Sequence, residues 1–179
     1  MDNNNLKIFT LFNFITAGVM GLLGPFYILY VEQLSGGVEY FGLAFAITVI
    51  FCSASSYLIG HLSDRFGRKL FLYLLTYTGA IILVLYTLID STIELFILQA
   101  AVGIITGASN TIETTILGDI TTKDDRGKSV GKFDATIAIA AAGGLILSGF
   151  AVKLYGIDVL FYVAAIVMIL STIIIKKMK

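Results

Sequence analysis

Apolar residues are grouped along this chain in long continuous blocks, and the charged residues gather in short clusters between the blocks. Six blocks are each about 20 residues long, which is the length of helix that crosses a hydrocarbon layer ~30 Å thick. The pattern predicts an all-α polytopic membrane protein whose residues 1–179 form a single bundle of six transmembrane helices. We expect these helices at residues 8–31, 40–62, 70–89, 93–117, 130–152 and 157–175.

The composition excludes several other classes of protein. The chain has 179 residues, of which 58% are hydrophobic and only 13% are charged, whereas a soluble domain carries about 25% charged residues. The apolar blocks are continuous rather than alternating, which argues against an outer-membrane barrel. The formal net charge is zero, so we expect no nucleic acid among the partners. The apolar blocks predict the lipid bilayer as a partner.

The positions of the cationic residues predict the orientation in the membrane. If the N-terminus is cytoplasmic, eleven of the 12 Lys and Arg residues lie on the cytoplasmic side and only Lys153 lies outside. Positively charged loops are normally retained in the cytoplasm. We therefore expect both termini inside the cell, and we expect an aromatic belt at the outer interface that consists of Tyr30, Tyr40, Tyr86 and Tyr155.

The two halves of the chain resemble each other. An offset of 89 residues aligns four pairs of glycines, namely Gly18 with Gly107, Gly42 with Gly131, Gly60 with Gly149 and Gly67 with Gly156. With three helices in each copy, the copies face opposite sides of the membrane. The offset predicts an inverted repeat of residues 1–89 and 90–179, an architecture typical of transporters.

The loop between the second and third expected helices carries the most specific motif. It reads Gly60-His61-Leu62-Ser63-Asp64-Arg65-Phe66-Gly67-Arg68-Lys69 and resembles the signature loop of the major facilitator superfamily, written G-x-L-a-D-r-x-G-r-k. The resemblance implies an integral transporter of a prokaryotic-type plasma membrane, in which the acid of the loop docks on the positive N-terminal end of a helix in the other half. The residues that match, and to which this gating role falls, are Gly60, Leu62, Asp64, Arg65, Gly67, Arg68 and Lys69.

The resemblance continues in the next cytoplasmic loop, where Asp119 and Arg126 are expected to pair with Arg68 and Asp64. Two departures argue against a proton-coupled drug antiporter of that family. Phe96 stands where those proteins carry an arginine, and the segment Gly144-Leu145-Ile146-Leu147-Ser148-Gly149 lacks their proline.

Polar residues follow one face of the fourth expected helix. Their spacing of three and four residues puts them on a single stripe, and a polar stripe should face protein or water rather than lipid. Glu113 is interpreted either as a group that binds solute or carries a proton, or as a hydrated acid near the interface, paired with Lys123 or Arg126. The cavity candidates are Gln99, Thr106, Asn110 and Glu113, with Asn13, Thr16 and Tyr27 on the first helix, which Pro25 should kink.

The residues of the chain do not form the pattern of a nucleophile and base, a metal site or a phosphate-binding loop, so we expect neither an enzyme nor a cofactor. Transporters of the superfamily contain two six-helix bundles, and this chain matches one. We expect transport of a small solute, with or without proton coupling, by a homodimer. The alternatives are a partnership with a different six-helix half, a fragment of a longer transporter, or a non-transporting accessory or truncated subunit bound to another transporter half. The expected interface contains small residues that allow close packing, namely Ser55, Ser56, Ala142, Gly143, Ser148 and Gly149.

Overall fold

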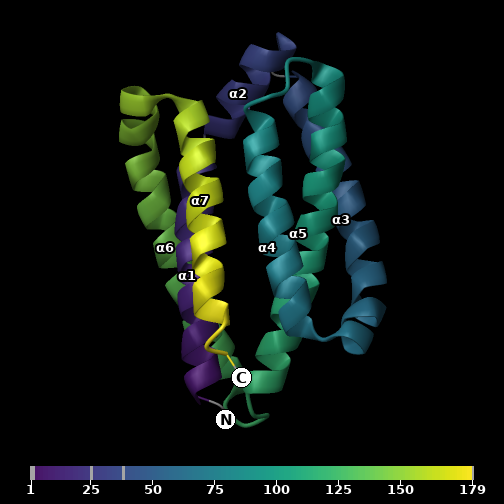
Figure 1. Ribbon diagram of the computed structural model, residues 1–179, viewed down its shortest axis with the longest axis vertical. Coiled ribbons are helices and arrows are strands. Elements are labelled where there is room, and N and C mark those ends of the chain that lie inside the picture. The colour runs from purple at the N-terminus through teal and green to yellow at the C-terminus, as the bar shows by residue number, and fades with distance from the viewer. Residues whose placement is uncertain (1–2, 25, 38, 179) are drawn as a thin grey trace.

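The computed structural model describes residues 3–24, 26–37 and 39–178, apart from the side chains of residues 3, 35, 61 and 63–66. All regular structure within these residues is helical, as Figure 1 shows. Six of the helices are long and apolar enough to cross a membrane, which confirms the expected all-α polytopic fold. In chain order the helices are α1 (Asn3–Leu23), α2 (Phe26–Ser35), α3 (Glu39–Phe66), α4 (Arg68–Tyr86), α5 (Thr92–Ile120), α6 (Arg126–Tyr155) and α7 (Ile157–Ile175).

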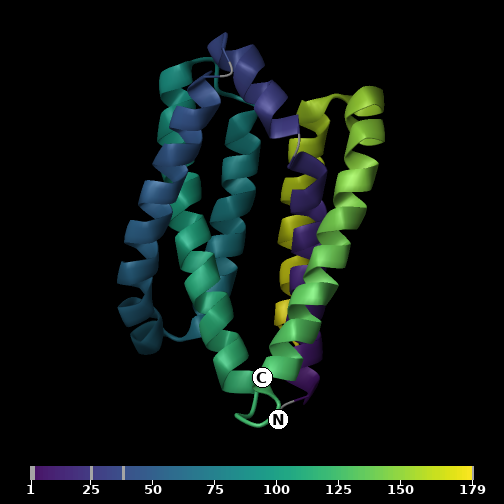
Figure 2. The same cartoon turned by 180° about the vertical axis from the view of Figure 1, so that it is seen from behind.

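The first expected helix, residues 8–31, is divided in the structure. α1 ends at Leu23, and the separate helix α2 of 10 residues begins at Phe26. The physical reason is Pro25 in the intervening sequence, because proline has no N–H to donate to the carbonyl of Gly21 and its ring clashes with the preceding turn of a continuous helix. α2 consequently lies across one end of the bundle (Figures 1 and 2).

The helices that follow continue past the apolar blocks into charged sequence. α3 runs to Phe66 and α4 begins at Arg68, so Gly67 alone connects them. The φ angle of Gly67 is 86°, in the left-handed region that glycine adopts without strain. At the start of α5, Ser91 and Glu94 form a capping box that satisfies two backbone N–H groups.

The helices pack in a pattern that relates the two halves of the chain. α3 packs on α5 and α1 packs on α6, while α7 contacts both α1 and α4, and α4 also contacts α5. If α1 is exchanged with α5, α3 with α6 and α4 with α7, this set of packed pairs is unchanged. The start of α1 and the end of α7 lie at the same end of the bundle (Figures 1 and 2).

Glycine permits the two most intimate helix crossings. A Cβ atom at Gly107 of α5 would collide with the carbonyl oxygen of Cys52 in α3. A Cβ atom at Gly144 of α6 would collide with the carbonyl oxygen of Gly18 in α1. Small residues allow the backbones of membrane helices to approach closely, which is how such helices gain packing energy where lipid removes the hydrophobic driving force.

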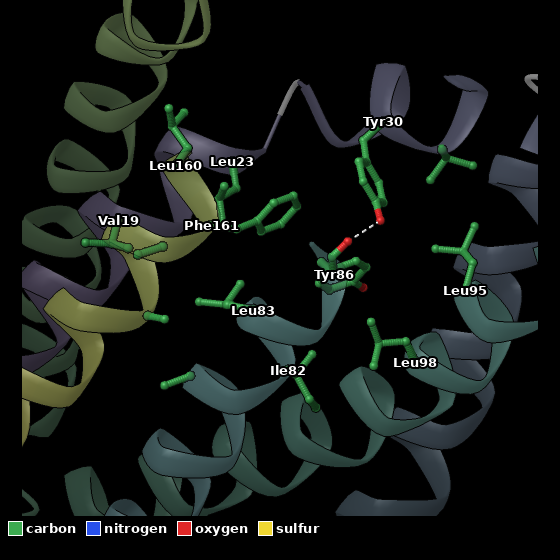
Figure 3. Packing of buried hydrophobic residues seen from close by; sticks show 14 of the residues in the cluster. Val19, Leu23, Tyr30, Ile82, Leu83, Tyr86, Leu95, Leu98, Leu160 and Phe161 are labelled. Atoms are coloured by element: carbon green, nitrogen blue, oxygen red, sulfur yellow. Dashed lines mark hydrogen bonds between the residues drawn. The ribbon is translucent and has the colours of Figure 1, made fainter. Parts of the chain in front are cut away.

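Two apolar clusters hold the bundle together, one toward each end. The cluster beside α2 contains Tyr30, Tyr86 and Phe161 (Figure 3). In the other cluster, Phe9 of α1 and Phe133 of α6 stack with their ring centroids 5.5 Å apart.

Candidate functional site

Helix α5 has two exposed faces of different chemistry. Ile93, Ile97 and Ile104 form an apolar face and are 72%, 67% and 46% exposed, as suits contact with lipid chains. Thr106 and Asn110 are also exposed, but at 100° per residue they lie about 140° around the helix from the isoleucines. An exposed polar face inside a membrane is costly against lipid, so this face suits a water-filled path or a protein partner.

Glu113 lies beside this polar face, one turn further along α5, and its side chain is partly buried. Asp134 of α6 is close enough to interact electrostatically with it. Two carboxyl groups on different helices that interact electrostatically can together attract a cation. Asp134 is not among the expected site residues, although it falls inside the expected helix 130–152 and an acid within a span is itself a signal of function.

Gln99, at the other end of the α5 stripe, is 3% exposed and does not lie on an open wall. Its side-chain oxygen accepts a hydrogen bond of 2.6 Å from Thr48 of α3. Its amide nitrogen donates to the hydroxyl of Tyr86 at 2.8 Å and to the hydroxyl of Tyr27. Gln99 therefore joins α2, α3, α4 and α5 in one buried hydrogen-bond network.

Tyrosine residues close the end of the bundle beneath α2. Tyr30 donates a hydrogen bond of 2.5 Å to the backbone carbonyl of Tyr86, and the ring of Tyr86 stacks on that of Phe161 at 5.2 Å (Figure 3). Burial, followed by the nearby Tyr86, raises the pKa of Tyr30 above its ordinary value. Tyr30 and Tyr86 are 8% and 5% exposed. The expectation of an interfacial belt is therefore wrong for these two residues, because hydrogen bonding inside the protein removes their polar ends from the interface.

The polar residues of the first expected helix are separated by the break near Pro25. Asn13 and Thr16 lie on α1, partly buried, and both donate to backbone carbonyls of α1 itself, at 3.1 Å to Phe9 and 3.2 Å to Phe12. Tyr27 lies on α2 and belongs to the Gln99 network. The three residues therefore do not form one stripe.

The signature loop is anchored to neighbouring elements through its cations. Arg68 forms an ion pair with Asp119 and donates a 2.8 Å hydrogen bond to the carbonyl of Thr115, both on α5. Lys69 donates to the carbonyl of Met178 beyond α7. Gly60 and Leu62 lie in the last two turns of α3. The side chains of Asp64 and Arg65 lie outside the described residues.

Arg126 binds the end of α5 through hydrogen bonds. Its guanidinium donates to the carbonyl of Gly118 at 2.9 Å and to the carbonyl and hydroxyl of Thr121. These carbonyls belong to the last turn of a helix, where a cation is favoured by unpaired C=O groups and by the helix dipole. Arg126 thus stabilises the turn that joins α5 to α6.

Half of the expected interface residues face the inside of the bundle. Ser55 donates to the carbonyl of Ile104 at 2.7 Å, and Ser56 donates to that of Gly107 at 3.2 Å, so both are used in the contact of α3 with α5. Ser148 is 1% exposed. A hydroxyl needs a hydrogen-bond acceptor in an apolar environment, and these hydroxyls find one within the chain. Ala142, Gly143 and Gly149 are exposed on α6.

Comparison with known proteins gives matches over most of the chain. The family model described as Major Facilitator Superfamily matches residues 9–177. An "uncharacterized MFS-type transporter", YitZ of Bacillus subtilis (strain 168), is 27% identical over 156 residues, which are 87% of this chain and 95% of that protein.

Longer proteins match as well. The "multidrug resistance protein MdtG" is 30% identical in Proteus mirabilis (strain HI4320) and 31% identical in Escherichia coli (strain 55989 / EAEC), over 95% and 93% of this chain. The chain spans only 43% and 42% of the length of these two proteins. It therefore corresponds to less than half of MdtG but to nearly all of YitZ.

Proposed function

Because this chain belongs to the Major Facilitator Superfamily, we propose that it carries a small solute across the membrane by alternating access, as a half-size unit in a homodimer. The observation that carries the proposal is the exposed polar face of α5, formed by Thr106 and Asn110 beside Glu113. In a single bundle this polar face is exposed on the surface and is not covered on its outer side. A second bundle would enclose it and so complete a path.

The path in this proposal is lined by Thr106, Asn110 and Glu113 of α5, with Asn13 and Thr16 of α1. Glu113 and its neighbour Asp134 hold the coupling proton or the cationic group of the solute. Gln99 and Tyr27 take a different role and seal the end of the path beneath α2, because their polar atoms are already bonded to each other and to Tyr86.

Both termini are cytoplasmic in this proposal. The start of α1 and the end of α7 lie at one end of the bundle, and the order of the spans along the sequence predicts eleven of the 12 Lys and Arg residues on that side of the membrane. Cationic loops favour the cytoplasmic side of a plasma membrane. The seal beneath α2 then faces outward, and the signature loop faces the cytoplasm.

We further propose that the bundle is an inverted repeat of residues 1–89 and 90–179. The pairs of packed helices map onto themselves when the two sets of three are exchanged. The offset of 89 residues matches Gly18 in the α1–α6 crossing with Gly107 in the α5–α3 crossing, and each provides a close helix contact.

The homodimer proposal is supported by two exposed stripes of small residues at matching positions. On α3 the stripe consists of Gly42, Ala46 and Ser53, and on α6 it consists of Gly131, Ala135 and Ala142. A Cβ atom at Gly42 or Gly131 would meet nothing within 4 Å, so packing inside the bundle does not account for these glycines. Small residues on an exposed helix face allow a second helix to approach closely.

The signature loop would act across this interface. Asp64 follows the α3 stripe, and α6 begins at Arg126. In a two-fold pair, Asp64 of one copy docks on the N-terminal end of α6 in the other, where unpaired N–H groups attract an anion. Every such contact occurs twice. Arg68 supports the loop by pairing with Asp119.

Transport in reconstituted vesicles tests the activity. We expect a panel that includes cationic drugs, sugars and amino acids to contain at least one solute that the protein moves. Asp64→Asn should slow this transport about fivefold or more while the protein still inserts, because one lost helix-end anion contact and its mirror image cost about 1 kcal/mol or more together. Asp124→Asn, an exposed acid of the next cytoplasmic loop, is the control and should transport as the wild type does. Equal rates in Asp64→Asn and wild type would contradict the role of the loop.

Glu113→Gln tests proton coupling in the same vesicles. We expect transport by this variant to lose its dependence on pH, because an amide cannot exchange a proton at the position beside Asp134. Glu32→Gln, exposed on α2, is the matched control. An unchanged rate and an unchanged pH profile in Glu113→Gln would remove this carboxyl group from the mechanism and favour a hydrated acid without a role in transport.

Cysteine cross-linking in native membranes tests the dimer. Ser53 and Ala142 are exposed on the two stripes, so we expect Ser53→Cys with Ala142→Cys, in a Cys52→Ser background, to give a covalent dimer. The control pairs Ser53→Cys with Ile166→Cys, since Ile166 is 57% exposed on α7, away from both stripes. Absence of the dimer, with capture of a different membrane protein instead, would favour the accessory-subunit alternative.

A further inference from the structure

Helices α1 and α6 enclose a groove of about 600 Å³ at the end of the bundle where α1 begins. The volume lies within the range of about 300–1,000 Å³ that is typical of small-molecule sites. The walls combine three lysines, Lys7, Lys128 and Lys132, with apolar side chains that include Leu11 and Phe14. One acid, Asp125, also lines the groove, so cations outnumber anions by three to one.

The groove opens away from the polar residues that we assign to the path. Leu11 and Asn13 are two residues apart on α1, and Lys132 and Asp134 are two residues apart on α6. Two residues correspond to about 200° of rotation around a helix. Leu11 and Lys132 therefore lie on the sides of their helices opposite Asn13 and Asp134, so the groove does not open toward the proposed path.

The charged and apolar parts of the groove lie at different depths. All three lysines fall in the first two turns of their helices, within about 10 Å of the helix starts. Phe14 lies about 10 Å further along α1 than Lys7, and Leu11 and Phe14 are 50% and 39% exposed. The charges are therefore at the level of lipid headgroups, and the exposed apolar side chains are at the level of acyl chains.

The lysines form a favourable site for an anion. Lys128 and Lys132 are one turn apart on α6, where like charges repel each other, and Lys7 adds a third charge from α1. Long lysine side chains reach toward the interface from apolar surroundings. Basic pockets between transmembrane helices bind anionic headgroups. We propose that this groove holds one anionic phospholipid, with its phosphate among Lys7, Lys128 and Lys132 and an acyl chain along Leu11 and Phe14.

In the proposed orientation the groove lies in the cytoplasmic leaflet of the membrane. Lipid binding by the groove does not require that the protein transports a solute. A lipid at this position would cover the crossing of α1 and α6 near the stacked rings of Phe9 and Phe133. It would thereby stabilise the contact between the two helices that carry the path residues Asn13 and Asp134.

Native mass spectrometry of the full chain in detergent tests the proposal, with phosphatidylglycerol as the anionic probe and phosphatidylcholine as the zwitterionic one. We expect the wild type to retain one phosphatidylglycerol in preference to phosphatidylcholine. The triple variant Lys7→Gln, Lys128→Gln, Lys132→Gln should lose this preference, with binding weakened roughly fivefold for each lysine removed. The single variant Lys132→Gln provides the same test, with a fivefold loss, if the triple variant does not fold.

The matched control is Lys123→Gln, Lys176→Gln, Lys177→Gln, which removes the same charge from exposed lysines at the same end of the protein but outside the groove. It should bind phosphatidylglycerol as the wild type does. Equal losses in the two triple variants would mean non-specific attraction and would overturn the proposal. Equal retention of phosphatidylcholine would overturn it as well. Displacement of the lipid by glycerophosphoglycerol, which has the headgroup without acyl chains, would identify a site for a free anion instead.

Discussion

At the scale of single residues, the structure separates polar side chains that are used inside the protein from those that remain available. Gln99 and Asn110 lie on the same sequence stripe of α5. Gln99 is buried and both ends of its amide are hydrogen-bonded, whereas Asn110 is exposed. Only the second kind of residue can bind a solute without first breaking an internal hydrogen bond.

Replacing Gln99 tests its structural role. We expect Gln99→Leu to destabilise the bundle by about 1–3 kcal/mol, because Thr48 and Tyr86 lose their shared partner in a buried environment. Thermal unfolding in detergent measures the effect. Gln33→Leu, an exposed glutamine on α2, is the control and should unfold near the wild-type temperature. Equal unfolding temperatures in the two variants would mean that the network contributes little to stability.

At the scale of helices, two crossings with glycine at the contact organise the fold. α3 meets α5 at Gly107, and α1 meets α6 at Gly144, in both cases backbone against backbone. At the preceding residue, Gly143, an added Cβ atom would meet nothing within 4 Å. Of these two neighbouring glycines, Gly144 is packed against α1 and Gly143 faces open space, because successive residues of a helix point in directions about 100° apart.

This contrast provides a matched pair of variants. We expect Gly144→Ala to lower stability by about 1–3 kcal/mol, since its Cβ must push the backbone of α1 away. Gly143→Ala should be neutral or stabilising by up to about 1 kcal/mol, because alanine favours the helix and the space is open. Unfolding temperatures of the two purified variants measure the difference. A larger loss in Gly143→Ala than in Gly144→Ala would contradict the crossing of α1 and α6 described above.

At the scale of the whole molecule, the single bundle leaves polar and small residues exposed on its surface instead of enclosing them. Its exposed surface includes the polar face of α5 and the stripes of small residues on α3 and α6. The proposed homodimer would account for these features together, because a second bundle would pack on the stripes and enclose the polar face.

Gly131→Leu tests this arrangement at one position. The substitution adds a large side chain to the α6 stripe at a place where a Cβ atom would meet no other helix within 4 Å, so the single chain should fold unchanged while the dimer is blocked. Mass measurement in lipid nanodiscs should give two chains for the wild type and one for the variant. Ile166→Phe adds bulk to a lipid-facing site on α7 and should remain dimeric. A dimeric Gly131→Leu would exclude the α6 stripe from the interface.

Much of the fold was predictable from the sequence because a membrane imposes a length requirement that apolar blocks record directly. α7 has the expected bounds, 157–175, and the other spans differ mainly where they extend into charged loops. The division of the first span was only partly predictable. Pro25 indicated a kink, but the new direction of α2 depends on Tyr27 and Tyr30 bonding to residues of α4 and α5.

The candidate site was less predictable than the fold, because it depends on contacts between helices that are distant in the sequence. By itself, the sequence determined the number of spans, their order and the signature loop, since these depend on the length of apolar blocks and on local motifs. Only the tertiary structure decided that Gln99, Ser55 and Ser148 face inward, and that Glu113 lies near Asp134. Burial and partnership depend on how distant helices cross, and a stripe on one helix does not specify which neighbour it meets.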